Sequence, residues 1–85
     1  MQTIKPVTVE QMDTFFKKAL KDAVELGINP RNSEMLDIDT LEAIWAISRA
    51  YPKTDVELVQ KARAAWQSEL DWLRSDRYRA LLAGL

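Results

Sequence analysis

The stretch LEAIWAISRAY, residues 41–51, decides the fold of this chain. Eight of its eleven residues are apolar. On a helical wheel they occupy almost the whole circumference, apart from the narrow stripe that Glu42 and Arg49 share. A helix that is apolar nearly all round has to be covered on every side. We therefore expect it either at the centre of a small core or beneath a second chain.

Both ends of this helix, predicted over 40–51, are marked in the sequence. The Asp39 carboxylate is expected to cap the first backbone amides, with Glu42 supplying the reciprocal bond, and Pro52 ends the helix. A second capping box, Thr54 to Glu57, follows almost at once and opens a helix over 55–74. So short a connection makes the two helices neighbours.

Upstream, the pattern predicts an amphipathic helix over 9–26. Thr8 and Gln11 form a capping box at its start, and Val7 and Met12 are spaced for a hydrophobic staple. Gly27 supplies the left-handed residue that ends it. Residues 1–6, ahead of the cap, are expected to be a loose arm. Residues 29–37 form a polar connector in which one short helical turn could begin at Ser33.

Downstream, the apolar side of the helix 55–74 is not continued beyond Ser75-Asp76. At 3.6 residues per turn the later apolar side chains would point roughly 150° away from it. Either the helix breaks there and a short helix over 76–84 folds back, or one long helix offers a second apolar face to a partner. Ser and Asp cap helices more often than they occupy helix interiors, which favours the break. The side chains concerned are Tyr78, Leu81, Leu82 and Leu85.

No segment shows the alternation of a β-strand, and the chain has only two glycines and three prolines, which separate helical segments. The sequence therefore predicts an all-α protein, a small three- or four-helix bundle. A chain of 85 residues can bury only one modest core, so residues 1–85 are expected to form a single domain.

The chain contains neither cysteine nor histidine, which excludes much of the usual chemistry. Disulfide scaffolds, thiolate or imidazole metal sites, cysteine nucleophiles and histidine general bases are all excluded. Carboxylate pairs remain, but nothing in the pattern fixes two acids across a pocket, and a bundle this small rarely leaves a substrate cavity. We expect a protein that is not an enzyme, with no cofactor and no metal.

The chain has no apolar run of about 18 residues and no signal-peptide pattern at its start. We expect a soluble, unexported protein of the cytoplasm, a compartment that the absence of cysteine fits. Binding of the helix 9–26 to a membrane surface is opposed by Asp13, Asp22 and Glu25.

Charge is distributed unevenly around a net charge of −1. Residues 22–57 carry eight acids against three bases, for −5, while residues 1–21 and 58–85 each carry +2. Four acids and no base occupy residues 34–42. This segment could dock on a basic groove or form a weak oxygen-only cation site. The simpler explanation, which we favour, is that acids gather where a helix begins.

The C-terminal segment interleaves arginines with aromatic residues, a composition found at the centres of protein interfaces and on single-strand nucleic-acid platforms. A purely structural role, in which cations offset a helix dipole and the aromatics pack inward, is the alternative. Near-neutral net charge argues against strong phosphate binding. The predicted partner-binding residues are Trp72, Arg74, Arg77, Tyr78, Arg79, Leu81 and Leu82, with Leu85 adding apolar surface.

Two further hypotheses are disfavoured by the residues themselves. A helix–turn–helix DNA reader would place the start of the helix 55–74 against phosphates, and that start carries Asp55 and Glu57. Glu69 lies inside the apolar arc of the same helix and would need a partner such as Arg49 if it were buried. A position at the rim of the core, with its carboxyl in water, is the favoured interpretation.

The sequence favours a small module that binds another protein: an adaptor, inhibitor or assembly chaperone, of a size common among bacterial and phage accessory proteins. Self-association through residues 76–85 would also cover their apolar side chains. The competing hypothesis is a nucleic-acid-binding regulator that uses the same arginines, with Lys17, Lys18 and Lys21 at the other end.

Overall fold

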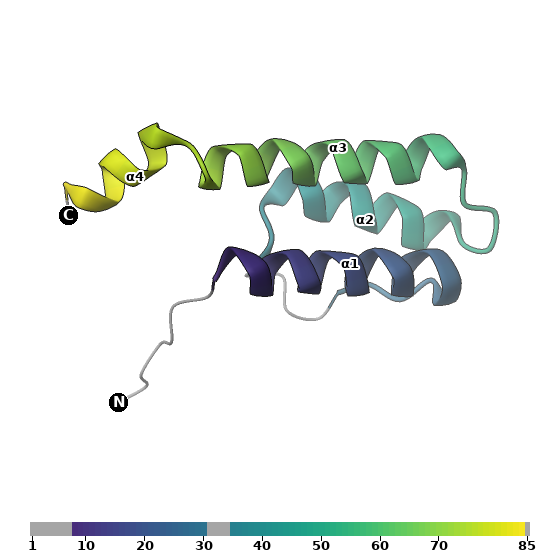
Figure 1. Cartoon of the computed structure of the whole chain (residues 1–85). Coiled ribbons are helices and arrows are strands. Elements are labelled where there is room, and N and C mark those ends of the chain that lie inside the picture. The colour runs from purple at the N-terminus through teal and green to yellow at the C-terminus, as the bar shows by residue number, and fades with distance from the viewer. Residues whose placement is uncertain (1–7, 31–34, 85) are drawn as a thin grey trace, which may run out of the picture.

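The computed structural model describes residues 8–30 and 35–84, and this part of the chain is helical, without strands. The predicted all-α bundle is confirmed, in its four-helix form. The predicted arm, residues 1–6, lies outside the described residues. In chain order the helices are α1 (Val9–Leu26), α2 (Ile38–Ala50), α3 (Val56–Leu73) and α4 (Asp76–Ala83) (Figure 1).

Helices α1 and α2 run in the same direction, and α3 runs antiparallel to both (Figure 1). The short turn after α2 makes α2 and α3 neighbours, as predicted, and their mutual contact is the most extensive in the fold. Helix α4 instead leaves the end of α3 and extends beyond the three packed helices (Figure 1).

The core lies where α2 packs against both α1 and α3. Ile44 and Ile47 of α2 are completely buried, which places this apolar helix at the centre of the core, as the first alternative predicted. Trp45 is only half-buried and packs at the edge of the core. The buried apolar residues are Phe16, Ala19, Leu20, Ala23, Leu36, Leu41, Ala43, Ile44, Ile47, Ala62, Trp66 and Leu70.

Both ends of α1 are built as predicted. The Thr8 hydroxyl accepts a hydrogen bond from the Gln11 backbone amide at 3.1 Å, and the Thr8 amide donates to the Gln11 side chain at 2.9 Å. Gly27 ends the helix with φ 65°, in the left-handed region. A Cβ at this position would also lie 2.8 Å from the Tyr51 ring, so both conformation and space require glycine. The predicted partner of Met12, Val7, lies outside the described residues.

The predicted cap of α2 is wrong by two residues. Asp37, rather than Asp39, is the N-cap, and its carboxylate accepts hydrogen bonds from both the backbone amide and the hydroxyl of Thr40. Thr40 is completely buried, so its hydroxyl needs an acceptor, and Asp37 can satisfy it while capping the helix. Asp39 instead lies exposed in the first turn.

The predicted Thr54 capping box is also wrong, because Asp55 caps α3 and accepts from the Glu57 amide at 3.2 Å. The Thr54 hydroxyl is buried without a hydrogen-bond partner among the described residues. Of the polar connector, the short turn predicted from Ser33 lies partly outside the described residues, and only Met35 shows a helical turn.

The predicted break between the last two helices is confirmed. Ser75 has extended dihedral angles, and its hydroxyl accepts from the Tyr78 amide at 3.2 Å, so it is the N-cap of α4. The expectation that α4 folds back on the bundle is wrong, since it continues outward (Figure 1). One turn residue and one cap between the helices allow their axes to change direction without reversing.

Candidate functional site

Helix α4 is held against the end of α3 by two aromatic side chains. The rings of Trp72 and Tyr78 meet edge to face, with centroids 5.8 Å apart and planes at 63°. The Ser75 hydroxyl also donates to the Trp72 carbonyl at 2.6 Å, which fixes the turn between the two helices. The structure therefore brings together two of the residues predicted from the sequence to bind a partner.

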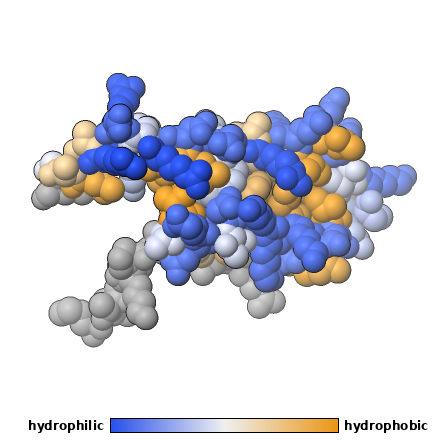
Figure 2. Space-filling model, viewed as in Figure 1, coloured by the Kyte–Doolittle hydropathy of each residue, from blue (hydrophilic) through white to orange (hydrophobic). Residues whose placement is uncertain are grey.

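The rest of α4 is uncovered, because none of its residues is buried. Leu81 is 60% exposed and Leu82 52%, and Trp72 at the end of α3 is 39% exposed. Figure 2 shows the apolar surface of α4 protruding at the left, beside hydrophilic side chains. Arg77, Trp72, Ala80 and Leu81 line a shallow depression on this surface.

The three predicted arginines do not form one patch with a single role. Arg77 and Arg79 are exposed on α4, and neither makes an ion pair within residues 8–30 and 35–84. Arg74 lies at the turn, close enough to α1 for its positive charge to help lower the pKa of Asp13. Leu85, predicted to extend the apolar surface, lies outside the described residues.

Carboxylates gather at the start of α2, at the end of the bundle from which α4 extends (Figure 1). Ile38 is 57% exposed between Asp37 and Asp39. Glu69 of α3 is half-buried at the edge of the core, and burial raises its pKa, as do the negative charges of Asp37 and Asp39. We call these four residues, Asp37, Ile38, Asp39 and Glu69, the acidic end. The sequence placed Glu69 in an apolar arc but gave no sign of its acidic neighbours.

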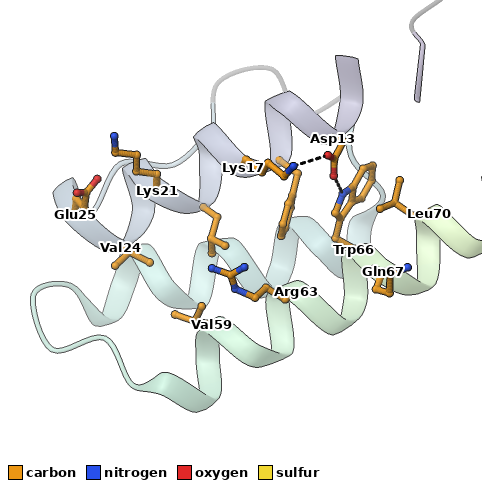
Figure 3. A pocket seen from close by; sticks show the side chains of 12 residues that line it. Asp13, Lys17, Lys21, Val24, Glu25, Val59, Arg63, Trp66, Gln67 and Leu70 are labelled. Atoms are coloured by element: carbon orange, nitrogen blue, oxygen red, sulfur yellow. Dashed lines mark hydrogen bonds and ion pairs between the residues drawn. The ribbon is translucent and has the colours of Figure 1, made fainter. Parts of the chain in front are cut away.

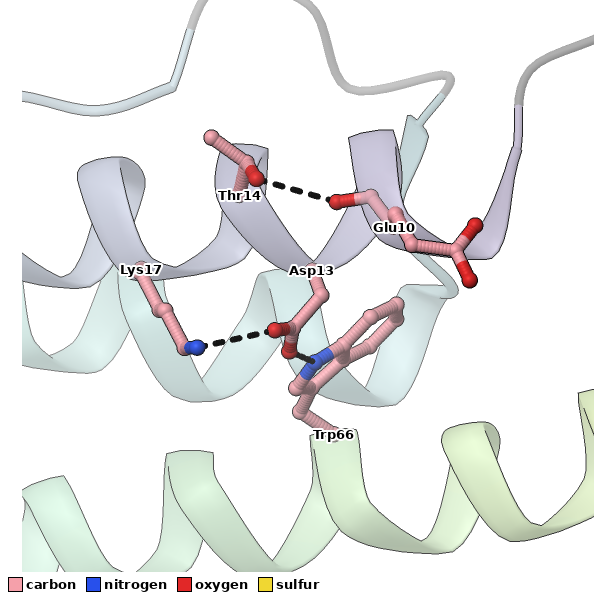
Figure 4. A network of polar contacts seen from close by, with 5 residues as sticks. All are labelled: Glu10, Asp13, Thr14, Lys17 and Trp66. Atoms are coloured by element: carbon pink, nitrogen blue, oxygen red, sulfur yellow. Dashed lines mark hydrogen bonds and ion pairs between the residues drawn. The ribbon is translucent and has the colours of Figure 1, made fainter.

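A polar contact that the sequence did not predict joins α1 to α3. The Trp66 indole N–H donates to Asp13 at 2.8 Å, and Lys17 pairs with the same carboxylate at 2.9 Å (Figure 4). The hydrogen bond from Trp66, which has the larger effect, and the contact with Lys17 hold the pKa of Asp13 below its usual range. Phe16 stacks on the Trp66 ring, with centroids 5.5 Å apart.

The same two helices border an open groove of about 650 Å³. Phe16, Leu20 and Trp66 on its floor are buried members of the core, whereas α4 has no buried residue. The Arg63 guanidinium lies across it (Figure 3). We interpret the groove as the seam along which α1 and α3 pack, and α4 as the stronger candidate for a binding surface.

Within the described part of the chain, no three carboxylates are arranged to hold a metal ion. None of the described helices combines the length and the apolar character that crossing a membrane requires. No protein-family model matches the chain, and no curated protein or solved structure matches it.

Proposed function

We propose that this chain is a small, non-enzymatic module that binds another protein through α4 and the last turn of α3. The observation that carries the proposal is that α4 buries none of its residues, so that two large apolar side chains, Leu81 and Leu82, are exposed to solvent. The contact residues of the proposal are Trp72, Arg74, Arg77, Tyr78, Arg79, Leu81 and Leu82.

Two physical arguments support this role. A helix of eight residues is marginal in water, and the single aromatic contact between Trp72 and Tyr78 is little to hold it. A partner that covers Leu81 would supply the missing burial. Trp, Tyr and Arg are also the residues most enriched where interfaces gain most of their binding energy.

The proposal includes the setting in which such a module works. An adaptor, inhibitor or assembly chaperone in the cytoplasm of a bacterium, or encoded by a phage, needs a rigid helical body and one protruding contact element. The packed helices α1 to α3 would serve as that body, and the lack of cysteine suits a reducing compartment.

Site-specific photo-crosslinking in cells of the source organism tests the proposal. A photoreactive residue in place of Leu81 is expected to capture a defined protein, whereas one in place of the exposed Glu57, at the start of α3, is not. Adding Arg77→Ala and Arg79→Ala should reduce the Leu81 adduct. Equal adducts from both positions, or none from Leu81, would contradict the proposal.

A nucleic-acid-binding regulator is the second candidate, because Arg77 is exposed and lines the same depression as Trp72. The acidic end disfavours it, because its three carboxylates lie at the same end of the bundle and repel the phosphates of an approaching nucleic acid. Binding to single-stranded DNA or RNA that falls steeply between low and moderate salt would favour this candidate. No detectable binding at low salt excludes it.

A further inference from the structure

Two uncovered surfaces of opposite charge lie at the same end of the bundle. The first is α4, where Arg77 and Arg79 flank the apolar side chains described above. The second is the acidic end, where Ile38 is exposed among carboxylates. Burial first, and then the negative charges of Asp37 and Asp39, raise the pKa of Glu69, which lies close enough to both carboxylates to sense their charge. The arginines of α4 and the carboxylates of the acidic end thus carry complementary charges.

A single molecule does not bring these two surfaces together. Helix α4 makes its main contacts with α3 and points away from the start of α2 (Figure 1). While α4 is helical, the Ser75 cap and the Trp72–Tyr78 contact set that direction. The acidic end of the same chain therefore stays open, and the complementary α4 has to come from a second chain.

We propose that two copies of this chain associate reciprocally, with α4 of each copy on the acidic end of the other. This inference rests on the proposed function, because it takes α4 as the interaction surface and identifies a second copy as its partner. Reciprocal contacts of this kind satisfy two-fold symmetry, in which each pair of contacts occurs twice. Such a dimer leaves neither copy with an α4 or an acidic end free to bind a third copy.

Apolar and charged side chains on both surfaces favour this arrangement over a contact between two α4 helices. Ile38 is the exposed apolar residue of the acidic end, and the depression lined by Trp72, Ala80 and Leu81 is apolar enough to receive it. Arg77, also part of that depression, would then face Asp39. A contact between two α4 helices would instead bring the arginines of both copies together, which like-charge repulsion opposes.

Charge reversal on each surface separately tests the proposal. The first variant, Arg77→Glu with Arg79→Glu, reverses α4. The second, Asp39→Lys with Glu69→Lys, reverses the acidic end and spares Asp37, which caps α2. Sedimentation equilibrium should show that the unaltered chain dimerises and that each variant alone associates at least tenfold more weakly. An equimolar mixture of the two variants should regain the lost affinity, because both of its reciprocal contacts are attractive again.

Two other outcomes would overturn the proposed dimer. If the acidic-end variant alone dimerises as well as the unaltered chain, the contact is between two α4 helices and the proposal is overturned. A monomer at high micromolar concentration also overturns it, while a Leu81 photo-adduct with a different protein would still support the proposed function. Circular dichroism verifies folding of both variants, and should one fail to fold, Ile38→Ala, which alters no charge, is expected to weaken the dimer at least several-fold.

Discussion

The indole nitrogen of Trp66 donates a 2.8 Å hydrogen bond to Asp13, joining α3 to α1 between residues 53 positions apart in sequence. The ring of the same tryptophan stacks on Phe16, so one side chain contributes both an apolar and a polar contact between the helices. Asp13 accepts a further contact from Lys17. This group of residues fixes how α1 lies against α3.

Asp13→Ala should lower the free energy of unfolding by about 1–3 kcal/mol, because it leaves the Trp66 N–H without its acceptor in a nearly buried position. Asp22→Ala is the matched control. Asp22 pairs with Lys18 at 3.1 Å on the same helix and is similarly exposed, 30% against 26% for Asp13, but it meets no tryptophan. Urea unfolding should give it a loss of only about 0.3–0.5 kcal/mol; equal losses would contradict the assigned role.

The stability that Asp13 contributes should depend on acid pH. Its hydrogen bond to Trp66, and then Lys17, hold its pKa below the ordinary value of 3.8, so the folded state favours the ionised carboxylate. The contribution is complete above the unfolded-state pKa and is lost as pH falls through the lower folded-state pKa. From pH 5 downward, the free energy of unfolding should therefore fall less for Asp13→Ala than for the unaltered chain. Parallel curves would contradict this.

Gly27→Ala should destabilise the protein by about 1–2 kcal/mol for the left-handed backbone alone, with an additional cost from the Tyr51 ring. The double variant Gly27→Ala with Tyr51→Ala separates the two causes. Relative to Tyr51→Ala alone, the alanine at 27 should then cost less, because the ring atoms are gone while the Cβ of residue 51, 2.9 Å from the added methyl group, remains. Thermal unfolding of the unaltered chain, the two single variants and the double variant measures this cycle. If Gly27→Ala costs the same stability with and without the Tyr51 ring, the ring plays no part.

Two glutamates on α3 should respond oppositely to the same substitution. Burial and the charges of Asp37 and Asp39 raise the pKa of Glu69, so its ionised form is disfavoured in the folded state. The stability from its protonated form is therefore present below the unfolded-state pKa and lost as pH rises through the higher folded-state pKa, so Glu69→Gln should raise stability at pH 7 by less than about 1 kcal/mol. Glu57→Gln should lower it slightly, because Glu57 lies in the favourable first turn. Chemical unfolding at pH 7 distinguishes the signs.

Ser75→Ala removes the cap of α4 and should cost about 1 kcal/mol of local stability. Since α4 contributes no buried residue, we expect faster amide hydrogen exchange at Tyr78 and Arg79 without a change in global unfolding. Thr8→Ala, which removes the equivalent cap of α1, should lower global stability by a similar amount. A global loss from Ser75→Ala would mean that α4 is part of the cooperative core.

Helix positions could be predicted because their signals are local. The Thr8 box, Gly27 and Ser75 each act within a few residues of chain, and each is found where the sequence indicated. Which aspartate caps α2, Asp37 or Asp39, does not depend on local sequence alone. Both can cap a helix, and burial of Thr40, a consequence of tertiary packing, decides for Asp37.

The candidate site was predictable only in part, for the same reason. The sequence predicted Leu81 and Leu82 as an apolar contact surface, and both are exposed, whereas the predicted fold-back of α4 was wrong (Figure 1). The acidic end combines residues of α2 and α3, and the Asp13 contact combines α1 and α3. Such juxtapositions depend on how helices are placed along one another, which periodicity within one helix does not determine.

The single aromatic contact of α4 has a thermodynamic consequence for binding. If α4 opens readily, only a fraction of the chains carries the binding-competent helix, and the observed dissociation constant is the intrinsic one divided by that fraction. Association then includes helix formation and should release heat with a negative change in heat capacity. Affinity could accordingly be raised by improving the helix propensity of α4 alone, with no new intermolecular contact.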